Sequence, residues 1–138
     1  MAKLVLRDCY IVINGVNFSD HASSVEVDLS KAEVETTNFS GSGRERVAGL
    51  KDDGFVINFQ QDYAAAQIDA TFYPLWNNET EFTVEVRPTS AAASTTNPKY
   101  TATCILLEYK PLSGKVGDLS ETQVKLPAQR TGITRATS

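Results

Sequence analysis

Apolar residues alternate with polar ones over most of this chain, and a period of two is the pattern of half-buried β-strands. The clearest instance is the run 9–18, in which an apolar stretch is interrupted by Asn14-Gly15. Asn-Gly supplies the two positive-φ positions of a type I′ turn, so this run predicts a hairpin. Further alternating runs occupy residues 25–29, 33–37, 55–59, 81–87, 100–109 and 119–126. A chain with this many short strands is expected to form an antiparallel β-sandwich or barrel-like domain.

One segment has a different period. Between residues 62 and 76 apolar residues return at the spacing of an amphipathic helix, in a stripe composed of Ala65, Ile68, Phe72 and Leu75. Asp62 is expected to be the N-cap or a first-turn acid, and Pro74 to kink or end the last turn. Trp76 is expected to pack in the core or to anchor the helix end. The sequence therefore predicts a mainly β domain with one flanking α-helix over about residues 62–76.

The length of 138 residues fits one domain with its own hydrophobic core, which we place at residues 1–126. Residues 127–138 form a polar, basic C-terminal tail that we expect to be disordered or ordered only by a partner. A small-residue stretch at 89–98 is either a flexible loop or the tip of a long hairpin. The net charge of −4 argues against a nucleic-acid-binding surface. The chain is acidic over 20–35 and basic from residue 87 onward, an asymmetry that self-binding could use.

The two cysteines, Cys9 and Cys104, both lie in apolar, strand-like runs. This placement favours buried free thiols, because a disulfide framework or a zinc site needs more ligands at closer spacing. The chain has no apolar run of signal-peptide length and none of membrane-spanning length. We therefore expect it to be made and to fold in a cytoplasm, without a membrane partner.

Residues that form catalytic or ligand-binding motifs are scarce. His21, the one histidine, stands in a polar stretch and is expected to be exposed or to act as a cap. Gly41-Ser42-Gly43 resembles a fragment of a phosphate loop, but the Lys-Ser/Thr pair and the following helix are missing. The acids at Asp52-Asp53 and Asp62 lack the spacing of a calcium loop, and no Gly-x-Ser-x-Gly elbow is present. We therefore expect no catalytic, cofactor or metal site, and a binding function without enzyme activity.

The segment ETTNFSGSGRERVAGLKDDG, residues 35–54, joins two predicted strands and exceeds the ~4–6 residues typical of connections in compact domains. It begins Gly-rich, carries Arg44, Glu45 and Arg46 in succession and ends in a charged turn. An antiparallel sheet also has edges whose unpaired backbone groups invite another chain. The favoured partner is a second copy of the same chain, because closing a sheet across subunits removes its edges.

The run VEVDLSKAEVETTNFSGSGRERVAGLKDDGFVINFQQDYAAAQIDATF resembles the major tail proteins, or tail tube proteins, of long-tailed bacteriophages. The similar features, over about residues 4–126, are an N-terminal hairpin, an acidic strand, E-x-T-x-F before a Gly/Arg loop, GLKD, a strand and a helix. The resemblance implies a β-sandwich-like subunit. Six subunits form a ring, their strands join into one barrel around a lumen, and rings stack into a tube through which DNA leaves. It implies a virion tail protein, assembled in the host cytoplasm, that meets other tail proteins at the tube ends.

The resemblance also implies roles for two groups of residues. An acidic lumen would repel phosphates and let DNA slide, and the candidate lumen-lining acids are Glu26, Asp28, Glu33 and Glu35. The alternative is a solvated outer strand face, and a one-residue change of register exchanges the two faces. The long loop would become an arm between subunits or rings, its charges meeting neighbours while its apolar residues anchor it. The contact candidates are Phe39, Arg44, Glu45, Arg46, Val47, Leu50, Lys51, Asp52 and Asp53.

Other functions are compatible with the same pattern. A head–tail connector, a capsid decoration protein or an inner tube subunit of a contractile or secretion system would keep the structural role and change its place. A monomeric β-sandwich that binds carbohydrate or a receptor would present an exposed aromatic cluster. An enzyme would need a role for His21 and is the least favoured of these alternatives.

Overall fold

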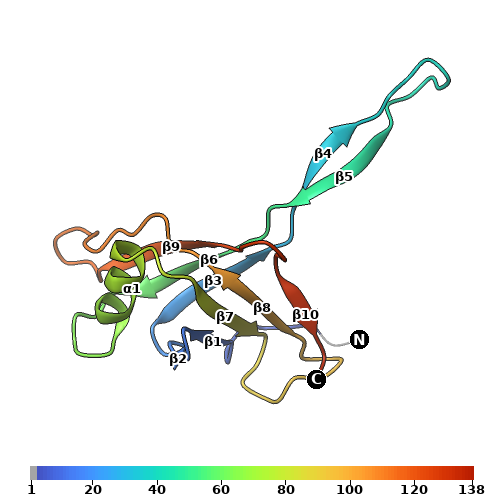
Figure 1. The fold of residues 1–138 in the computed structure, drawn as a ribbon. Coiled ribbons are helices and arrows are strands. Elements are labelled where there is room, and N and C mark those ends of the chain that lie inside the picture. The colour runs from blue at the N-terminus through green and yellow to red at the C-terminus, as the bar shows by residue number, and fades with distance from the viewer. Residues whose placement is uncertain (1–2) are drawn as a thin grey trace.

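The computed structural model describes residues 3–138, which form two stacked antiparallel sheets, one helix and a projecting hairpin (Figure 1). In chain order the elements are β1 Tyr10–Ile13, β2 Val16–Asn17, β3 Ala22–Asp28, β4 Lys31–Glu35, β5 Arg46–Lys51, β6 Gly54–Gln60, α1 Ile68–Asn77, β7 Phe82–Arg87, β8 Lys99–Cys104, β9 Glu121–Pro127 and β10 Thr134–Ala136. The predicted mainly β domain with one flanking helix is confirmed for the described residues. Its sheets are not closed into a barrel.

The hydrophobic core lies between the two sheets. The larger sheet has the strand order β10-β8-β7-β1-β2, and the smaller one has the order β3-β6-β9. In β6, Phe55, Ile57 and Phe59 are buried while the residues between them are half-buried. Ile13 of β1 and Val84 of β7 belong to the same buried cluster from the other sheet. The alternation in the sequence therefore becomes a sandwich in which each sheet turns one face to the core.

The first predicted hairpin is confirmed. β1 and β2 pair in antiparallel register, with Ile13 opposite Val16. The turn residues Asn14 and Gly15 have φ values of 52° and 80°. Positive φ at both central positions is the geometry of a type I′ turn, which Asn and Gly adopt with little steric cost.

The helix is shorter than predicted. It begins at Ile68, so Asp62 is not its N-cap, and Ala65 of the predicted stripe is exposed and lies before it. The cause is the backbone at Ala66, whose φ of 61° is left-handed and cannot continue a right-handed helix. The N-cap is Gln67, which makes no side-chain capping hydrogen bond.

α1 closes one end of the sandwich (Figure 1). Its buried residue Phe72 packs against Phe18, Phe59 and Tyr109, with ring centroids 6.1, 5.3 and 6.0 Å away. Trp76 is 43% exposed, and its Nε1 donates to the Leu107 carbonyl at 3.3 Å. Of the two roles expected for this tryptophan, the structure gives it that of a helix-end anchor.

His21 is neither exposed nor a helix cap, which corrects the expectation from sequence. Its side chain is 17% exposed. Its Nδ1 lies 2.8 Å from Asp20 Oδ1, and its Nε2 lies 2.9 Å from Asp62 Oδ2. The hydrogen bond with Asp62 raises the pKa of His21, as does Asp20, while burial opposes the shift. Only the doubly protonated ring can donate to both carboxylates, so this arrangement favours the charged imidazole, and His21 links the residue before β3 to the segment before α1.

The C-terminal segment belongs to the fold. β10 pairs with β8, with Thr134 opposite Thr101, and Ile133 is buried in the core cluster. The Gln129 N–H also donates to the Thr103 carbonyl at 2.7 Å. The expectation that residues 127–138 are disordered or ordered only by a partner is therefore wrong. The polar composition of this segment concealed one buried isoleucine next to a short strand.

Three smaller expectations have clear outcomes. Cys9 and Cys104 are free thiols, as predicted; burial raises the pKa of Cys104 to about 12, while Cys9 is only half-buried. Residues 89–98 form the tip of the β7–β8 hairpin, where buried Asn97 donates to the Ala91 carbonyl. The predicted strand 100–109 is shorter, because β8 ends at Cys104.

The buried carboxylate of Asp53 holds the junction between the sandwich and the projecting hairpin. Its Oδ1 accepts from the Ser30 N–H at 2.8 Å and its Oδ2 from the Ile133 N–H at 2.9 Å. Lys51 Nζ lies 3.4 Å from Oδ2. Burial acts to raise the pKa of Asp53, but these donors outweigh it, so the pKa lies below its ordinary value. Asp53 was predicted to contact a neighbouring subunit; the structure instead buries it in its own chain.

Replacing Asp53 with Ala should destabilise the sandwich. The N–H groups of Ser30 and Ile133 would lose their acceptor in a buried site, which is worth about 1–3 kcal/mol of unfolding free energy. Chemical denaturation checks this, with Asp52→Ala as the matched control because its side chain is exposed and should change stability by less than about 0.5 kcal/mol. Equal effects of the two variants would contradict the assigned role of Asp53.

The His21 bridge should make stability depend on pH near neutrality. Because the folded-state pKa lies above the ordinary 6.5, the stabilisation is complete below that pH and is lost as pH rises through the folded value. The unfolding free energy of the wild type should therefore fall from pH 6 to pH 8, and that of His21→Asn should change less. Since His21 is the one histidine, its NMR titration reports the pKa directly. A pKa at or below 6.5 would contradict the bridge.

Candidate assembly surfaces

β4 and β5 form an arm that projects away from the sandwich as a two-stranded hairpin (Figure 1). Every residue of β4 is exposed, and so is every residue of β5 except the half-buried Gly49. The prediction of a loop over 35–54 was therefore wrong for residues 46–51. Alanine and glycine are depleted in strands, so the sequence Val47-Ala48-Gly49 gave a weak strand signal. A lone two-stranded hairpin is marginally stable in water.

The register of the arm gives it one charged face and one apolar face. Glu35 lies opposite Arg46, and Val34 lies opposite Val47. Because side chains alternate between the faces of a strand, the two valines lie on the face away from that charged pair. Val34 was missed as a contact candidate, although its alternation with Glu33 and Glu35 would have revealed it.

Two residues beside the valines on the apolar face of the arm, Ala32 and Gly49, are small. A Cβ added at Gly49 would come within 3.0 Å of Val34 Cγ2 and 3.3 Å of Ala32 Cβ. Glycine therefore lets β4 and β5 approach closely on this side.

The arginines of the arm pair with acids of the same arm. Arg46 Nε lies 2.7 Å from Glu33 Oε1, and Arg44 Nε lies 3.9 Å from Glu35 Oε1. All four side chains are exposed, so each pair contributes only ~0–1 kcal/mol. From the sequence, the charged groups of Arg44 and Arg46 were predicted to pair with neighbouring subunits. The structure shows that each arginine pairs with an acid of its own arm. These exposed pairs are weak enough for a second chain to compete for the same groups.

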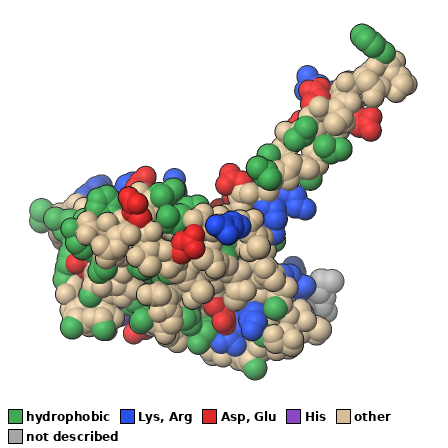
Figure 2. All heavy atoms as spheres, in the orientation of Figure 1, with side chains coloured by type: hydrophobic (Ala, Val, Ile, Leu, Met, Phe, Trp, Pro, Cys, Tyr) green, Lys and Arg blue, Asp and Glu red, His purple; other side chains and the backbone are tan. Residues whose placement is uncertain are grey.

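Large apolar side chains are exposed along the arm, and Figure 2 shows them reaching its tip. Val34, Val47 and Leu50 are 46%, 51% and 85% exposed, and Phe39 is fully exposed. Single exposed apolar residues are ordinary on protein surfaces, but a set of them on one unpacked hairpin marks an interaction surface. The predicted contact residues Phe39, Val47 and Leu50 are therefore all exposed on the arm, with Phe39 at its tip and Leu50 near its base. Whether they contact a neighbour stays a prediction.

The remaining contact candidates lie at the two ends of the arm. Glu45 is exposed near the tip, and its N–H donates to Thr37 Oγ1 at 2.9 Å. Asp52 is exposed at the base. Lys51 Nζ, also at the base, donates to the Thr131 carbonyl at 3.1 Å and thus ties the arm to the C-terminal segment.

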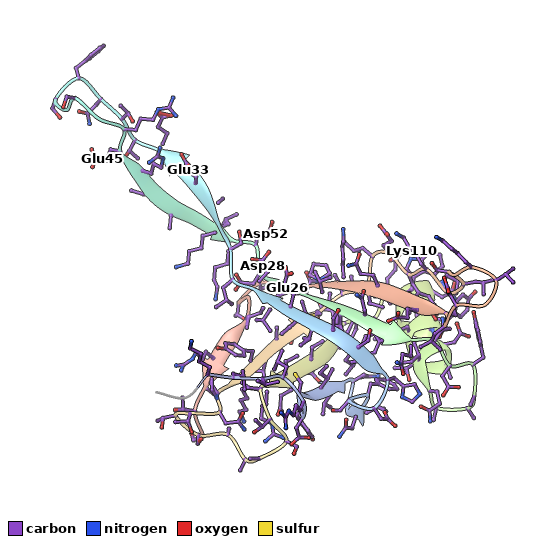
Figure 3. The ribbon with its side chains drawn as sticks, turned by 180° about the vertical axis from the view of Figure 1, so that it is seen from behind. Glu26, Asp28, Glu33, Glu45, Asp52 and Lys110 are labelled. Atoms are coloured by element: carbon purple, nitrogen blue, oxygen red, sulfur yellow. The ribbon has the colours of Figure 1, made fainter. Side chains whose placement is uncertain are left out.

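The four candidate lumen acids are divided between two surfaces (Figure 3). Glu33 and Glu35 lie on the arm. Glu26 and Asp28 lie on β3, on the exposed face of the sandwich, since their neighbours Val25 and Val27 pack against the core. The structure thus does not bring the four acids together.

The exposed face of the smaller sheet is polar but not uniformly acidic. Glu26 pairs across the sheet with Val56, which pairs in turn with Lys125 of β9. Gln123 of β9 lies opposite Asn58 on the same face. The sequence gives no signal for Lys125, because only the strand register places it on the same face as Glu26.

The described residues offer little for catalysis or ligand chemistry. They contain no group of three or more His, Cys, Asp or Glu side chains placed to hold a metal ion. Both ring nitrogens of His21 contact carboxylates, which leaves no hydroxyl nucleophile on the ring. Gly41-Ser42-Gly43 lies at the arm tip with no helix after it. In residues 3–138 no helix is both long and apolar enough to cross a bilayer.

Neither a protein-family model nor a curated protein matches this chain. Solved structures do match it at the level of the fold. A chain of the SPP1 tail tube superposes with a TM-score of 0.77 at 10% sequence identity, covering 99% of this chain and 80% of that one. A chain of the native gene transfer agent virion gives a TM-score of 0.73 at 8% identity, covering 94% of this chain and 95% of that one.

A chain of the sheath–tube complex of the extracellular contractile injection system PVC gives a TM-score of 0.68 at 10% identity, covering 99% of this chain and 93% of that one. Identities this low carry information about architecture only. The fold implied by the resemblance in the sequence is thereby confirmed: this chain has the fold found in the SPP1 tail tube.

Proposed function

We propose that this chain is a structural subunit that assembles with copies of itself into stacked hexameric rings, which form the tail tube of a long-tailed bacteriophage. The tube is a conduit for DNA ejection, and the chain has no catalytic role. The observation that carries the proposal is the arm, a hairpin with an exposed apolar face. Its own chain leaves this face uncovered, on a fold shared with the SPP1 tail tube.

In this proposal, the partner of the arm is a second copy of the same chain. A hairpin that is marginally stable alone gains stability when its apolar face is buried, at about 25 cal/mol per Å². In a homopolymer each copy both supplies an arm and receives one, so every arm except those at the ends is covered. Charge pairs that repeat along the tube set register even though each is weak.

Ring formation is supported by the open edges of the smaller sheet. β3 and β9 are its outer strands, and its order β3-β6-β9 leaves β3 with one hydrogen-bonded neighbour among the described strands. An unpaired strand edge is a template for pairing with another chain. Joining these sheets around a ring produces a barrel without edges, with the polar face toward the lumen.

In that arrangement Glu26 lines the conduit, whereas Asp28, the last residue of β3, lies at the base of the arm (Figure 3). Carboxylates facing DNA repel its phosphates and prevent the counterion-driven binding that basic grooves produce. Glu33 and Glu35 extend the acidic character only where the arms approach the lumen. Lys125 on the same sheet face reduces the negative charge without reversing it.

The place of assembly in the proposal is the virion tail, built in the host cytoplasm without a membrane partner. Other tail proteins meet the tube at its ends. This part is supported by a further fold match, the anti-feeding prophage cap, which terminates a tube and gives a TM-score of 0.71 at 11% identity.

A second candidate function is an inner tube subunit of a contractile injection system. It is favoured by the match to the PVC sheath–tube complex, which has a TM-score of 0.68. The two functions differ in whether a sheath contracts around the tube, and both use the same ring-forming subunit.

Electron microscopy of the purified protein tests the proposal. We expect rings and tubes that become more abundant with protein concentration. Sixfold symmetry in averaged end views would support the hexamer. A chain that remains monomeric at high concentration, with its arm intact, would overturn the assignment, and closed rings that never stack would favour a connector.

Removing the arm should separate folding from assembly. Lys31 pairs with Lys51 at its base, so an Asn-Gly turn can replace residues 32–50 and close the shortened hairpin. We expect an unfolding midpoint close to that of the wild type, because the arm contributes little to the core, and complete loss of tubes. Sedimentation and chemical denaturation measure the two properties. Loss of folding would show that the arm supports the core, and tubes built without it would contradict its assigned role.

Reversing the charge of the lumen should make the tube retain DNA. In a Ser24→Lys, Glu26→Lys double variant, tubes should bind duplex DNA, protect it from nuclease and release it at high salt. The control variant Glu79→Lys, Asp118→Lys carries its lysines on exposed sites outside the smaller sheet. DNA on those tubes should remain sensitive to nuclease. Equal protection by the two variants would place the exposed face of β3 outside the lumen.

A further inference from the structure

A cavity of about 300 Å³ opens at the base of the arm, where the start of β6 and the end of β9 meet the chain after β8. Its apolar wall includes Val56, Leu107 and Pro127. Leu107 is 67% exposed, so this side chain has little cover from its own chain. The cavity is therefore an apolar site open to solvent.

Carboxylates surround this apolar wall. Asp28, Asp52 and Glu108 line the cavity together with one cation, Lys125. Figure 3 shows Asp28 and Asp52 close to one another at the base of the arm. Glu108 has Lys110 at 3.5 Å, while among the described residues no cation lies within 4.0 Å of Asp28 or Asp52. The rim is thus negative, and its best occupant combines an apolar group with a positive charge.

The tip of the arm has this combination. Phe39 is fully exposed. Arg44 follows it in the tip, with a side chain that is 70% exposed and a long 3.9 Å contact to Glu35. Aromatic and arginine side chains are enriched among the anchors that dominate protein interfaces.

The tip cannot reach the cavity of its own chain. The arm extends away from the sandwich (Figure 1), and the residues from Lys31 to Phe39 span about 26 Å at ~3.3 Å per residue. The occupant of the cavity is therefore supplied by another copy.

We propose that Phe39 of one copy fills the cavity at the arm base of the next copy, with Arg44 placed against Asp28 and Asp52. This inference rests on the proposed function and names the surface that receives the arm. The contact is heterologous, because each copy presents a tip at one end and a cavity at the other, so it propagates from copy to copy. It sets the offset between bonded copies at about the arm length, ~26 Å.

Photocrosslinking tests the docking directly. Phe39 is replaced by the photoreactive aromatic residue p-benzoyl-phenylalanine, tubes are assembled and irradiated, and the linked peptides are identified by mass spectrometry. We expect links between copies to the peptides that contain Val56, Leu107 or Pro127. Links to Leu112 or Val116, in the part of the β8–β9 connection that does not line the cavity (the far loop), would overturn the docking while leaving the proposed function intact. A protein that never assembles would overturn both.

Substitutions provide an independent measurement. Phe39→Ala should raise the concentration needed for assembly by roughly thirtyfold, the ratio that corresponds to an interface anchor worth about 2 kcal/mol. Val116→Ala, at a fully exposed apolar site on the far loop, is the control and should leave that concentration unchanged. Both variants should keep the unfolding midpoint of the wild type. Equal effects of the two substitutions on assembly would refute the docking.

The charge contact has its own test. Arg44→Glu should weaken assembly, and so should Asp28→Arg. An equimolar mixture of the two should assemble through pairs of unlike variants, because in either order the tip of one variant meets a rim of opposite charge on the other. Sedimentation of a mixture with one labelled variant detects such pairs. Failure of the mixture to associate better than either variant alone would place Arg44 and Asp28 in different interfaces.

Discussion

The hydrogen-bonded pairing of β3 with β6 determines most of what this molecule can do. Within the sandwich these strands bury Phe55, Ile57 and Phe59. Past the sandwich the same two stretches of chain continue as β4 and β5, which pair with each other and contact the C-terminal segment through Lys51 at the base. The same antiparallel pair of chain segments thus forms part of the core as β3 and β6 and then extends out of the sandwich as β4 and β5. The transition occurs at Ser30 and Asp52, where the Asp52 N–H still donates to the Ser30 carbonyl at 2.8 Å.

The chemistry of the surface follows from that transition. On the sandwich, strand alternation separates core residues from polar ones, as in any half-exposed sheet. On the arm the same alternation continues without a core, so one face remains apolar and exposed. The charges on its other face pair with one another, which keeps the arm soluble and discourages unspecific sheet growth along its edges. The assembly function proposed above accounts for both faces.

Much of the fold could be predicted from the sequence, because it depends on local periodicity. Asn14-Gly15 and the stripe Ile68, Phe72 and Leu75 required no knowledge of the rest of the chain. Features set by distant contacts were missed. The backbone at Ala66 delays the helix, and Asp53 is buried by Ser30 and Ile133 from two remote segments. The contact candidates on the arm were recognisable as exposed, but their pairing as a hairpin depends on a register that runs through alanine and glycine.

Asp53 lies at the base of the arm, so a small rotation of the chain at this residue produces a larger displacement of the tip. A rotation of about 5° at the base displaces a tip ~26 Å away by about 2 Å, which is comparable to the tolerance of a packed contact. Three bonds to one carboxylate, from Ser30, Ile133 and Lys51, therefore control where Phe39 is carried in space. Hydrogen bonds that hold the arm base at Asp53 therefore also limit how far the Phe39 ring at the tip can move. In the assembly proposed above, a buried residue at the base of the arm would in this way set the position of the distant tip.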